Sequence, residues 1–184
     1  MKRVIIVHCW DGYPKKHWYS WLKKELEKKG FAVELPAMPE TAEPTLKKWL
    51  PYLQKTIGEA DEDTYLVGHS LGCITILHYL ENLPKGKRIG GTVLVAGFSE
   101  PIGYDELKSF FAKKVDYKKV KRSANKFVLI HSDNDPYVPM ERGTLMEAKL
   151  GAKLLVMRKA GHVTTQAGYK QLPQALKAVL EISK

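Results

Sequence analysis

The chain has 184 residues, of which 44% are hydrophobic and 27% charged, and its formal net charge is +10. This length and composition predict one globular domain, residues 1–184, and the sequence has no low-complexity segment or internal repeat. No apolar run is long enough to span a membrane, and Val4–Val7 is too short for a signal-peptide core, so a cytoplasmic protein is expected.

The distribution of charge and the cysteine count argue against nucleic acid and metal ions as partners. Lysines are spread over several predicted helices, and the densest basic cluster, Lys113–Arg122, has no DNA- or RNA-binding motif beside it. Glu25 and Glu27 alternate with lysines, as on a solvated helix face. Cys9 and Cys73 have no metal-ligand spacing, so both are expected to be free structural thiols.

The first elements read as strand, helix, strand, helix. Arg3–His8 is almost continuously apolar, which is typical of a buried strand in a parallel sheet. Tryptophans and leucines at helical spacing predict an amphipathic helix over Lys15–Lys29, and a short strand follows at Phe31–Leu35. A second helix is predicted over Thr45–Ile57, capped by its first residue and kinked at Pro51.

The next stretch carries the most informative motif of the chain. A short apolar strand, Tyr65–Val67, leads into Gly68-His69-Ser70-Leu71-Gly72, and a helix is predicted over Leu71–Asn82. Strand, G-x-S-x-G and helix is the setting of a nucleophile elbow, in which a serine hydroxyl is lifted clear of the sheet on a strained turn. The alternative interpretation is a glycine-rich turn whose serine only caps the helix. The motif therefore makes Ser70 a candidate nucleophile.

The second half of the chain continues the alternation of strands and helices. Its strands are predicted at Gly91–Gly97, Lys126–His131 and Ala152–Met157, and its helices at Pro139–Leu150 and Gly168–Ser183. Phe98–Asn125 is the least regular stretch and carries several aromatic residues among lysines. The pattern predicts an α/β fold: a doubly wound, mostly parallel sheet with helices on both faces.

A serine nucleophile needs a base, and six histidines are available. His162 follows the last strand in a loop, where its side chain can reach over a neighbouring strand end. It also completes the chain order serine, acid, histidine. The others have structural interpretations, as neighbours of the turn, residues at strand ends, or packed or surface residues of helices: His8, His17, His69, His78 and His131.

The base in turn needs a carboxylate that orients it. Asp133 and Asp135 both lie at the end of the penultimate strand. Asp135 is favoured because the following Pro136 pushes it into an extended conformation, while the alternative role of either residue is a loop cap. Glu100, after the fourth strand, is a weaker third candidate.

Taken together, these segments resemble the α/β-hydrolase superfamily, and more narrowly the small serine hydrolases that include retinoblastoma-binding protein 9 and bacterial proteins of the YdeN type. The resemblance runs nearly end to end, through His17-Trp18, Trp21–Leu26, Met38-Pro39, Trp49–Pro51, Gly68-His69-Ser70, Asp135–Pro139 and Gly161-His162. It implies a compact domain without a large lid and a catalytic triad of Ser70, Asp135 and His162. It also implies an oxyanion hole made by the backbone N–H of Leu71 and of a residue after the first strand. Trp10 is the candidate there, with Cys9 standing where the family usually has glycine.

The sequence thus predicts a serine hydrolase of the carboxylesterase type, acting on a small-molecule acyl ester through an acyl-enzyme on Ser70. No metal or organic cofactor is required by this chemistry. Without a large lid the pocket should be shallow and walled by Trp10, Tyr13 and aromatic residues of Phe98–Tyr117. The alternative function is a non-catalytic binding or scaffold protein built on a hydrolase fold.

Overall fold

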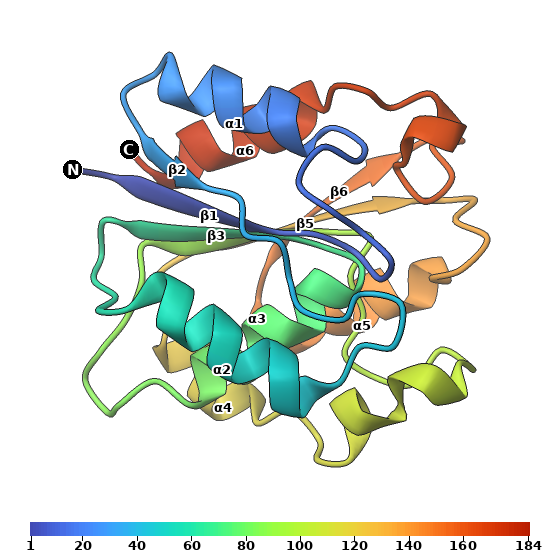
Figure 1. The fold of residues 1–184 in the computed structure, drawn as a ribbon, viewed down its shortest axis with the longest axis horizontal. Helices are drawn as coiled ribbons and strands as arrows, with labels where there is room; N and C mark the ends of the chain where they lie inside the picture. Colours follow the sequence, from blue (N-terminus) through green and yellow to red (C-terminus); the bar gives the residue numbers. More distant parts are fainter.

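The computed structural model describes residues 1–184 and contains a single six-stranded sheet in which every neighbouring pair of strands is parallel (Figure 1). The strands are β1 (Arg3–Val7), β2 (Ala32–Glu34), β3 (Thr64–His69), β4 (Gly91–Val95), β5 (Phe127–Ser132) and β6 (Lys153–Met157). Their spatial order is β2-β1-β3-β4-β5-β6, so the winding direction reverses between β1 and β3. The predicted α/β class with a doubly wound parallel sheet is confirmed.

Helices cover both faces of this sheet (Figure 1). They are α1 (Tyr19–Glu27), α2 (Leu46–Ile57), α3 (Leu71–Glu81), α4 (Tyr117–Arg122), α5 (Met140–Leu150) and α6 (Pro173–Ile182), with 3₁₀ helices η1 (Asp105–Phe111) and η2 (Thr165–Ala167). Figure 1 shows α1 and α6 on one face and α2, α3 and α5 on the other. None of these helices combines the length and the apolar composition needed to span a bilayer.

The strands are buried on both sides, which accounts for their continuous apolar sequences. In β1, Val4 and Ile6 join the core beneath α1 and α6, while Ile5 and Val7 join the core beneath α2 and α3. All four side chains are fully buried. The alternation of successive side chains along a strand therefore supplies two cores from one sheet.

Two predicted helix starts and one predicted helix cap differ from the structure. Helix α1 begins at Tyr19 rather than Lys15, because His17 has φ = 56°, which a right-handed helix cannot contain. Helix α6 begins at Pro173 instead of Gly168, since proline fits the first turn, where no N–H donor is needed. Thr45 occupies the N-cap of α2 but its side chain makes no capping hydrogen bond.

The irregular stretch after β4 is attached to α3 by a buried pair of polar side chains. His78 places Nδ1 2.9 Å from Glu81 Oε1 and Nε2 2.8 Å from the Phe110 carbonyl oxygen. The other Glu81 oxygen accepts from the Asp116 backbone N–H at 2.8 Å. His78 is thus the packed residue that the sequence suggested, and it holds η1 in place against the helix that follows the serine turn.

Candidate active site

Ser70 lies between β3 and α3 in a conformation that non-glycine residues rarely adopt, with φ = 55° and ψ = −115°. Two backbone hydrogen bonds hold it there: the Ser70 N–H donates to the Val95 carbonyl and the Cys73 N–H donates to the Ser70 carbonyl, both at 2.9 Å. Strained residues of this kind persist only where the surrounding structure determines them. The turn presents the Ser70 side chain, which is only 7% exposed, to a pocket.

His162 and Asp135 come together over the same end of the sheet. His162 Nδ1 lies 2.7 Å from Asp135 Oδ2, and the carboxylate is completely buried. The other carboxylate oxygen, Oδ1, accepts from the backbone N–H groups of Tyr137 and Val138 at 2.9 and 3.0 Å. Both Asp135 oxygens are therefore occupied, and the His162 ring has a fixed partner on its Nδ1 side.

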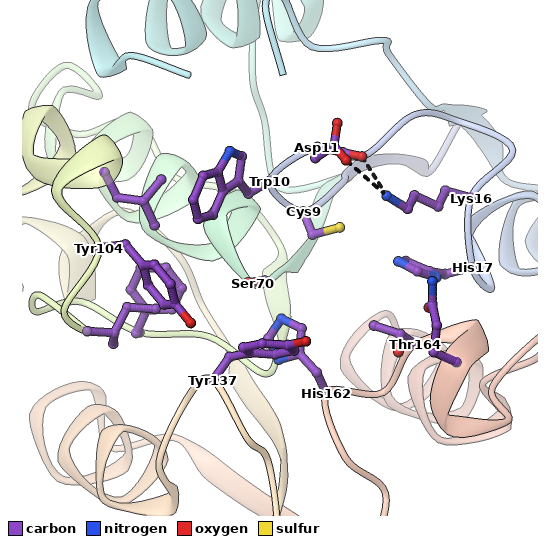
Figure 2. Close-up of a pocket in the computed structure, with 14 residues that line it drawn as sticks. Cys9, Trp10, Asp11, Lys16, His17, Ser70, Tyr104, Tyr137, His162 and Thr164 are labelled. Atoms are coloured by element: carbon purple, nitrogen blue, oxygen red, sulfur yellow. Dashed lines mark hydrogen bonds and ion pairs between the residues drawn. The ribbon is translucent and has the colours of Figure 1, made fainter. Parts of the chain in front are cut away.

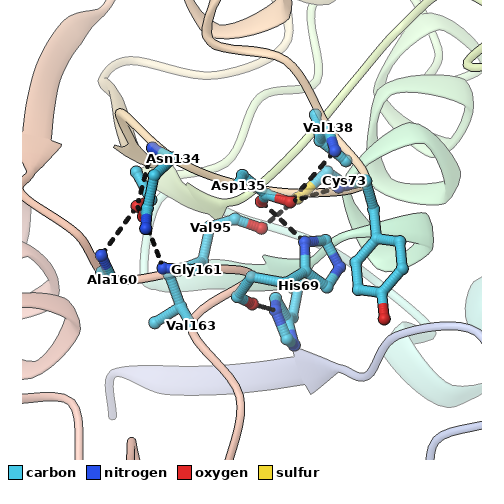
Figure 3. Close-up of polar contacts among 12 residues, drawn as sticks. His69, Cys73, Val95, Asn134, Asp135, Val138, Ala160, Gly161 and Val163 are labelled. Atoms are coloured by element: carbon cyan, nitrogen blue, oxygen red, sulfur yellow. Dashed lines mark hydrogen bonds and ion pairs between the residues drawn. The ribbon is translucent and has the colours of Figure 1, made fainter. Parts of the chain in front are cut away.

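The other carboxylates considered from the sequence do not reach His162. Asp133 Oδ1 accepts from the Lys159 backbone N–H at 2.7 Å, which is the loop-capping role. Glu100 forms an ion pair with Arg142 at 2.6 Å, outside the pocket. Asn134 also links the loop that carries Asp135 to the loop that carries His162, because its Oδ1 accepts from the Gly161 N–H at 2.9 Å (Figure 3).

The two backbone groups expected for an oxyanion hole lie at the same end of the sheet. Leu71 is the first residue of α3, where backbone N–H groups have no partner within the helix. The Trp10 N–H makes no hydrogen bond in the loop after β1, and its indole is oriented by a 3.0 Å hydrogen bond from Nε1 to the Ala42 carbonyl. The backbone N–H groups of Leu71 and Trp10 are thus two donors without a hydrogen-bond partner in the protein.

Ser70 and His162 lie between two contrasting walls of a pocket of about 460 Å³ (Figure 2). The apolar wall consists of Trp10, Phe98, Ile102, Tyr104 and Leu107, and the polar wall of Asp11, Lys16, His17, Thr164 and Gln166. Cys9 and Tyr137 complete the lining. Tyr13 was expected here but is absent, because its ring is 54% exposed and faces Lys16 instead.

Behind the serine turn, His69 connects the loop after β1 with the His162 loop. Its Nε2 donates to the His162 carbonyl oxygen at 2.9 Å, because a carbonyl can only accept. Nδ1 therefore accepts from the Tyr19 hydroxyl at 2.6 Å, and that hydroxyl accepts from the Cys9 N–H at 3.2 Å. Burial and the nearby His162 lower the pKa of His69 well below its ordinary value, so the ring is neutral.

His17 was interpreted as a packed or surface residue, but it lines the pocket. Its Nδ1 accepts from the Thr165 backbone N–H at 3.1 Å, a contact across 148 residues of sequence. Burial, Lys16 and His162 lower the pKa of His17 to about 4. No local sequence pattern predicts that His17 lines the pocket. In the structure its backbone is left-handed, with φ = 56°.

The remaining histidines and the cysteines lie in the core. His8 accepts from the Met38 N–H at 3.0 Å through Nε2, and His131 is fully buried with neither ring nitrogen hydrogen-bonded. Cys9 and Cys73 are free and buried, as expected. No group of three or more histidine, cysteine, aspartate or glutamate side chains is arranged to hold a metal ion.

A parallel sheet whose third strand ends in a strained serine turn, with an Asp–His pair from two later loops above the same pocket, defines an α/β hydrolase. Comparison with known proteins narrows this class. Residues 4–181 match the model of the serine hydrolase family. The chain belongs to that family and is a hydrolase.

Two curated relatives and one solved structure illustrate the similarity. YdeN of Bacillus subtilis (strain 168) is 34% identical over 94% of this chain and 91% of YdeN. Serine hydrolase RBBP9 of Rattus norvegicus is 26% identical over 97% of this chain and 95% of RBBP9. The crystal structure of the ydeN gene product superimposes with a TM-score of 0.95, covering 99% of this chain and 98% of the other.

More distant structures share the fold alone. Est1E from Butyrivibrio proteoclasticus, solved with ferulic acid bound, matches with a TM-score of 0.73 at 17% identity. The match covers 100% of this chain and 87% of Est1E. Est1E thus has the same arrangement of sheet and helices.

Proposed function

We propose that this hydrolase is a carboxylesterase that cleaves small acyl esters through a covalent acyl-enzyme on Ser70. The observation that carries the proposal is the buried Asp135–His162 pair beside the strained Ser70 turn at a single pocket. Strained backbone and a hydrogen-bonded Asp–His pair of this kind are concentrated at reaction centres. The name of the relative RBBP9, a serine hydrolase, supports hydrolysis by a serine enzyme.

In the first half of the reaction, Asp135 accepts a hydrogen bond from the Nδ1–H of His162, so Nε2 carries the free electron pair. Nε2 takes the Ser70 hydroxyl proton as the oxygen attacks the ester carbonyl carbon. The negative charge that develops on the carbonyl oxygen is stabilised by the backbone N–H groups of Leu71 and Trp10. The carbon–oxygen bond to the leaving group then breaks, and His162 returns its proton to the departing alcohol.

The second half repeats these steps with water in place of Ser70. His162 takes a proton from water as the water oxygen attacks the acyl carbon. The bond to the Ser70 oxygen breaks, Ser70 recovers its proton from His162, and the carboxylic acid leaves. In the structure the Ser70 hydroxyl makes no hydrogen bond to His162, and such contacts commonly tighten only when substrate is bound.

The proposal is tested by intact-mass detection of fluorophosphonate labelling on wild type and on Ser70→Ala. One adduct on the wild type and none on the variant is expected, because only an activated serine attacks the phosphorus. A folded wild type that acquires no adduct would contradict the proposal and favour a non-catalytic binding protein on this fold.

A further inference from the structure

The polar wall of the pocket contains a hydrogen-bond donor that no protein group uses. His17 Nδ1 accepts from the Thr165 backbone N–H, and a backbone N–H can only donate. The proton of the neutral ring is therefore on Nε2, which has no partner in the protein. Figure 2 shows His17 reaching into the pocket from the side opposite Tyr104, with Ser70 and His162 between them.

The charges around His17 indicate what this wall can bind. Lys16 donates to the Asp11 carbonyl oxygen at 2.7 Å and lies 3.7 Å from the Asp11 carboxylate. The lysine charge is thus balanced by its neighbour, and Thr164 and Gln166 are uncharged. A wall that is polar but electrically balanced suits a neutral group with hydrogen-bonding oxygens better than an anion.

The position of the base indicates which part of a substrate lies on this side. His162 must return its proton to the leaving group, so that group lies next to the His162 ring. Thr164 follows in the same loop, and Thr165 beside it holds His17. The polar wall is therefore continuous with the base. The apolar wall is built by other segments, among them the one carrying Tyr104, which Figure 2 shows on the other side of Ser70 from His17.

We propose that the polar wall binds the leaving group and the apolar wall a short aliphatic acyl group, with His17 Nε2 donating a hydrogen bond to the leaving group. The substrate class is an ester of a short aliphatic acid with a hydroxylated neutral alcohol. This assignment rests on the proposed esterase function of Ser70.

The test compares two butanoate esters, 1-monobutyrylglycerol and pentyl butyrate, whose alcohol parts have the same number of non-hydrogen atoms. The variant is His17→Asn: its Oδ1 can take the place of Nδ1 toward Thr165, and asparagine tolerates a positive φ. Its amide nitrogen stands where Cδ2 of the ring was and does not reach the position of Nε2, although the ring contacts with Tyr19 and His69 are also lost. The control is Lys15→Asn, because Lys15 is exposed in the same loop and does not line the pocket.

Wild type should prefer the glyceryl ester by kcat/KM. The ratio of kcat/KM for the two esters should fall about 3- to 10-fold in His17→Asn, the effect of one hydrogen bond, and stay unchanged in Lys15→Asn. A wild type that prefers the pentyl ester, or an unchanged ratio in His17→Asn, would overturn the assignment.

Fluorophosphonate labelling of the same samples separates this inference from the proposed function. Labelling of Ser70 with hydrolysis of neither ester would show that the substrate class is wrong while the activated serine stands. No labelling and no hydrolysis would mean that the proposed function fails and this inference with it.

Discussion

At the scale of single residues, two aspartates in one loop have separate tasks. Asp135 is buried and divides its oxygens between His162 and two backbone N–H groups, so its charge is stabilised without solvent. Asp133, two residues earlier, holds the Lys159 N–H and thereby the start of the His162 loop. One residue orients the ring and the other positions the loop that carries it.

These tasks predict different outcomes for the same substitution. Asp135→Asn replaces the acceptor for His162 Nδ1 with an amide that favours the wrong tautomer, so kcat should fall by about 10³- to 10⁴-fold. Asp133→Asn keeps an oxygen for the Lys159 N–H and should change kcat less than about 3-fold. Steady-state kinetics on a small ester measure both. Equal losses in the two variants would contradict the assignment of Asp135 as the orienting acid.

At the scale of elements, the serine turn depends on how closely α3 approaches β1. A Cβ built on Gly72 would lie 2.2 Å from the Val7 carbonyl oxygen, which belongs to the backbone of β1. A Cβ on Gly68 would meet the Ile76 side chain at 2.9 Å and the Cys73 backbone at 3.0 Å. Backbone therefore lies much closer to a Cβ on Gly72 than to one on Gly68.

Gly72→Ala should therefore be the more damaging of the two glycine substitutions. Pushing α3 away from β1 disturbs the core on that face, so the free energy of unfolding should fall by about 3 kcal/mol or more. Gly68→Ala should cost about 1–2 kcal/mol, because the Ile76 side chain can rotate and the Cys73 backbone has to give only slightly. Urea denaturation measures both; a Gly68 variant less stable than the Gly72 variant would show that the approach of α3 to β1 is not the limiting contact.

The order and type of the elements could be predicted from the sequence because they follow from local patterns. Buried parallel strands are continuous apolar runs, and G-x-S-x-G predicts the strand-to-helix turn at Ser70. Helix starts are less predictable: Lys15 and Lys16 are good helix formers, but His17 has a positive φ and its side chain is held by a contact with Thr165. A contact between residues 148 positions apart, such as His17 and Thr165, leaves no periodic pattern in the sequence.

The same limit applies to the site. Ser70, His162 and Asp135 follow from motifs and chain order, and the proline after Asp135 pointed to the residue that the structure places against His162. His17 and Tyr137 come to the pocket through packing alone. Tyr13 was expected at the pocket because of its neighbours in sequence, but its loop turns the ring toward solvent.

At the scale of the whole molecule, the core holds several histidines in their neutral form. Burial lowers the pKa of His8 and His69, and it lowers the pKa of His131 to about 4. In the unfolded chain each would titrate near 6.5. Between these pH values the unfolded chain binds protons that the folded chain does not, so acid favours unfolding.

The fold should therefore be most stable above about pH 6.5 and lose stability as the pH falls toward 4. His131 alone should account for about 2 kcal/mol of the loss between pH 7.5 and pH 5.0. His131→Leu is the variant of choice, because neither ring nitrogen has a hydrogen bond to lose. Urea denaturation at the two pH values should show a smaller difference in the free energy of unfolding for His131→Leu than for wild type. Because each protein is compared with itself, a change in overall stability caused by the new side chain does not enter the result. Equal differences in the two proteins would mean that His131 is not held neutral by its burial.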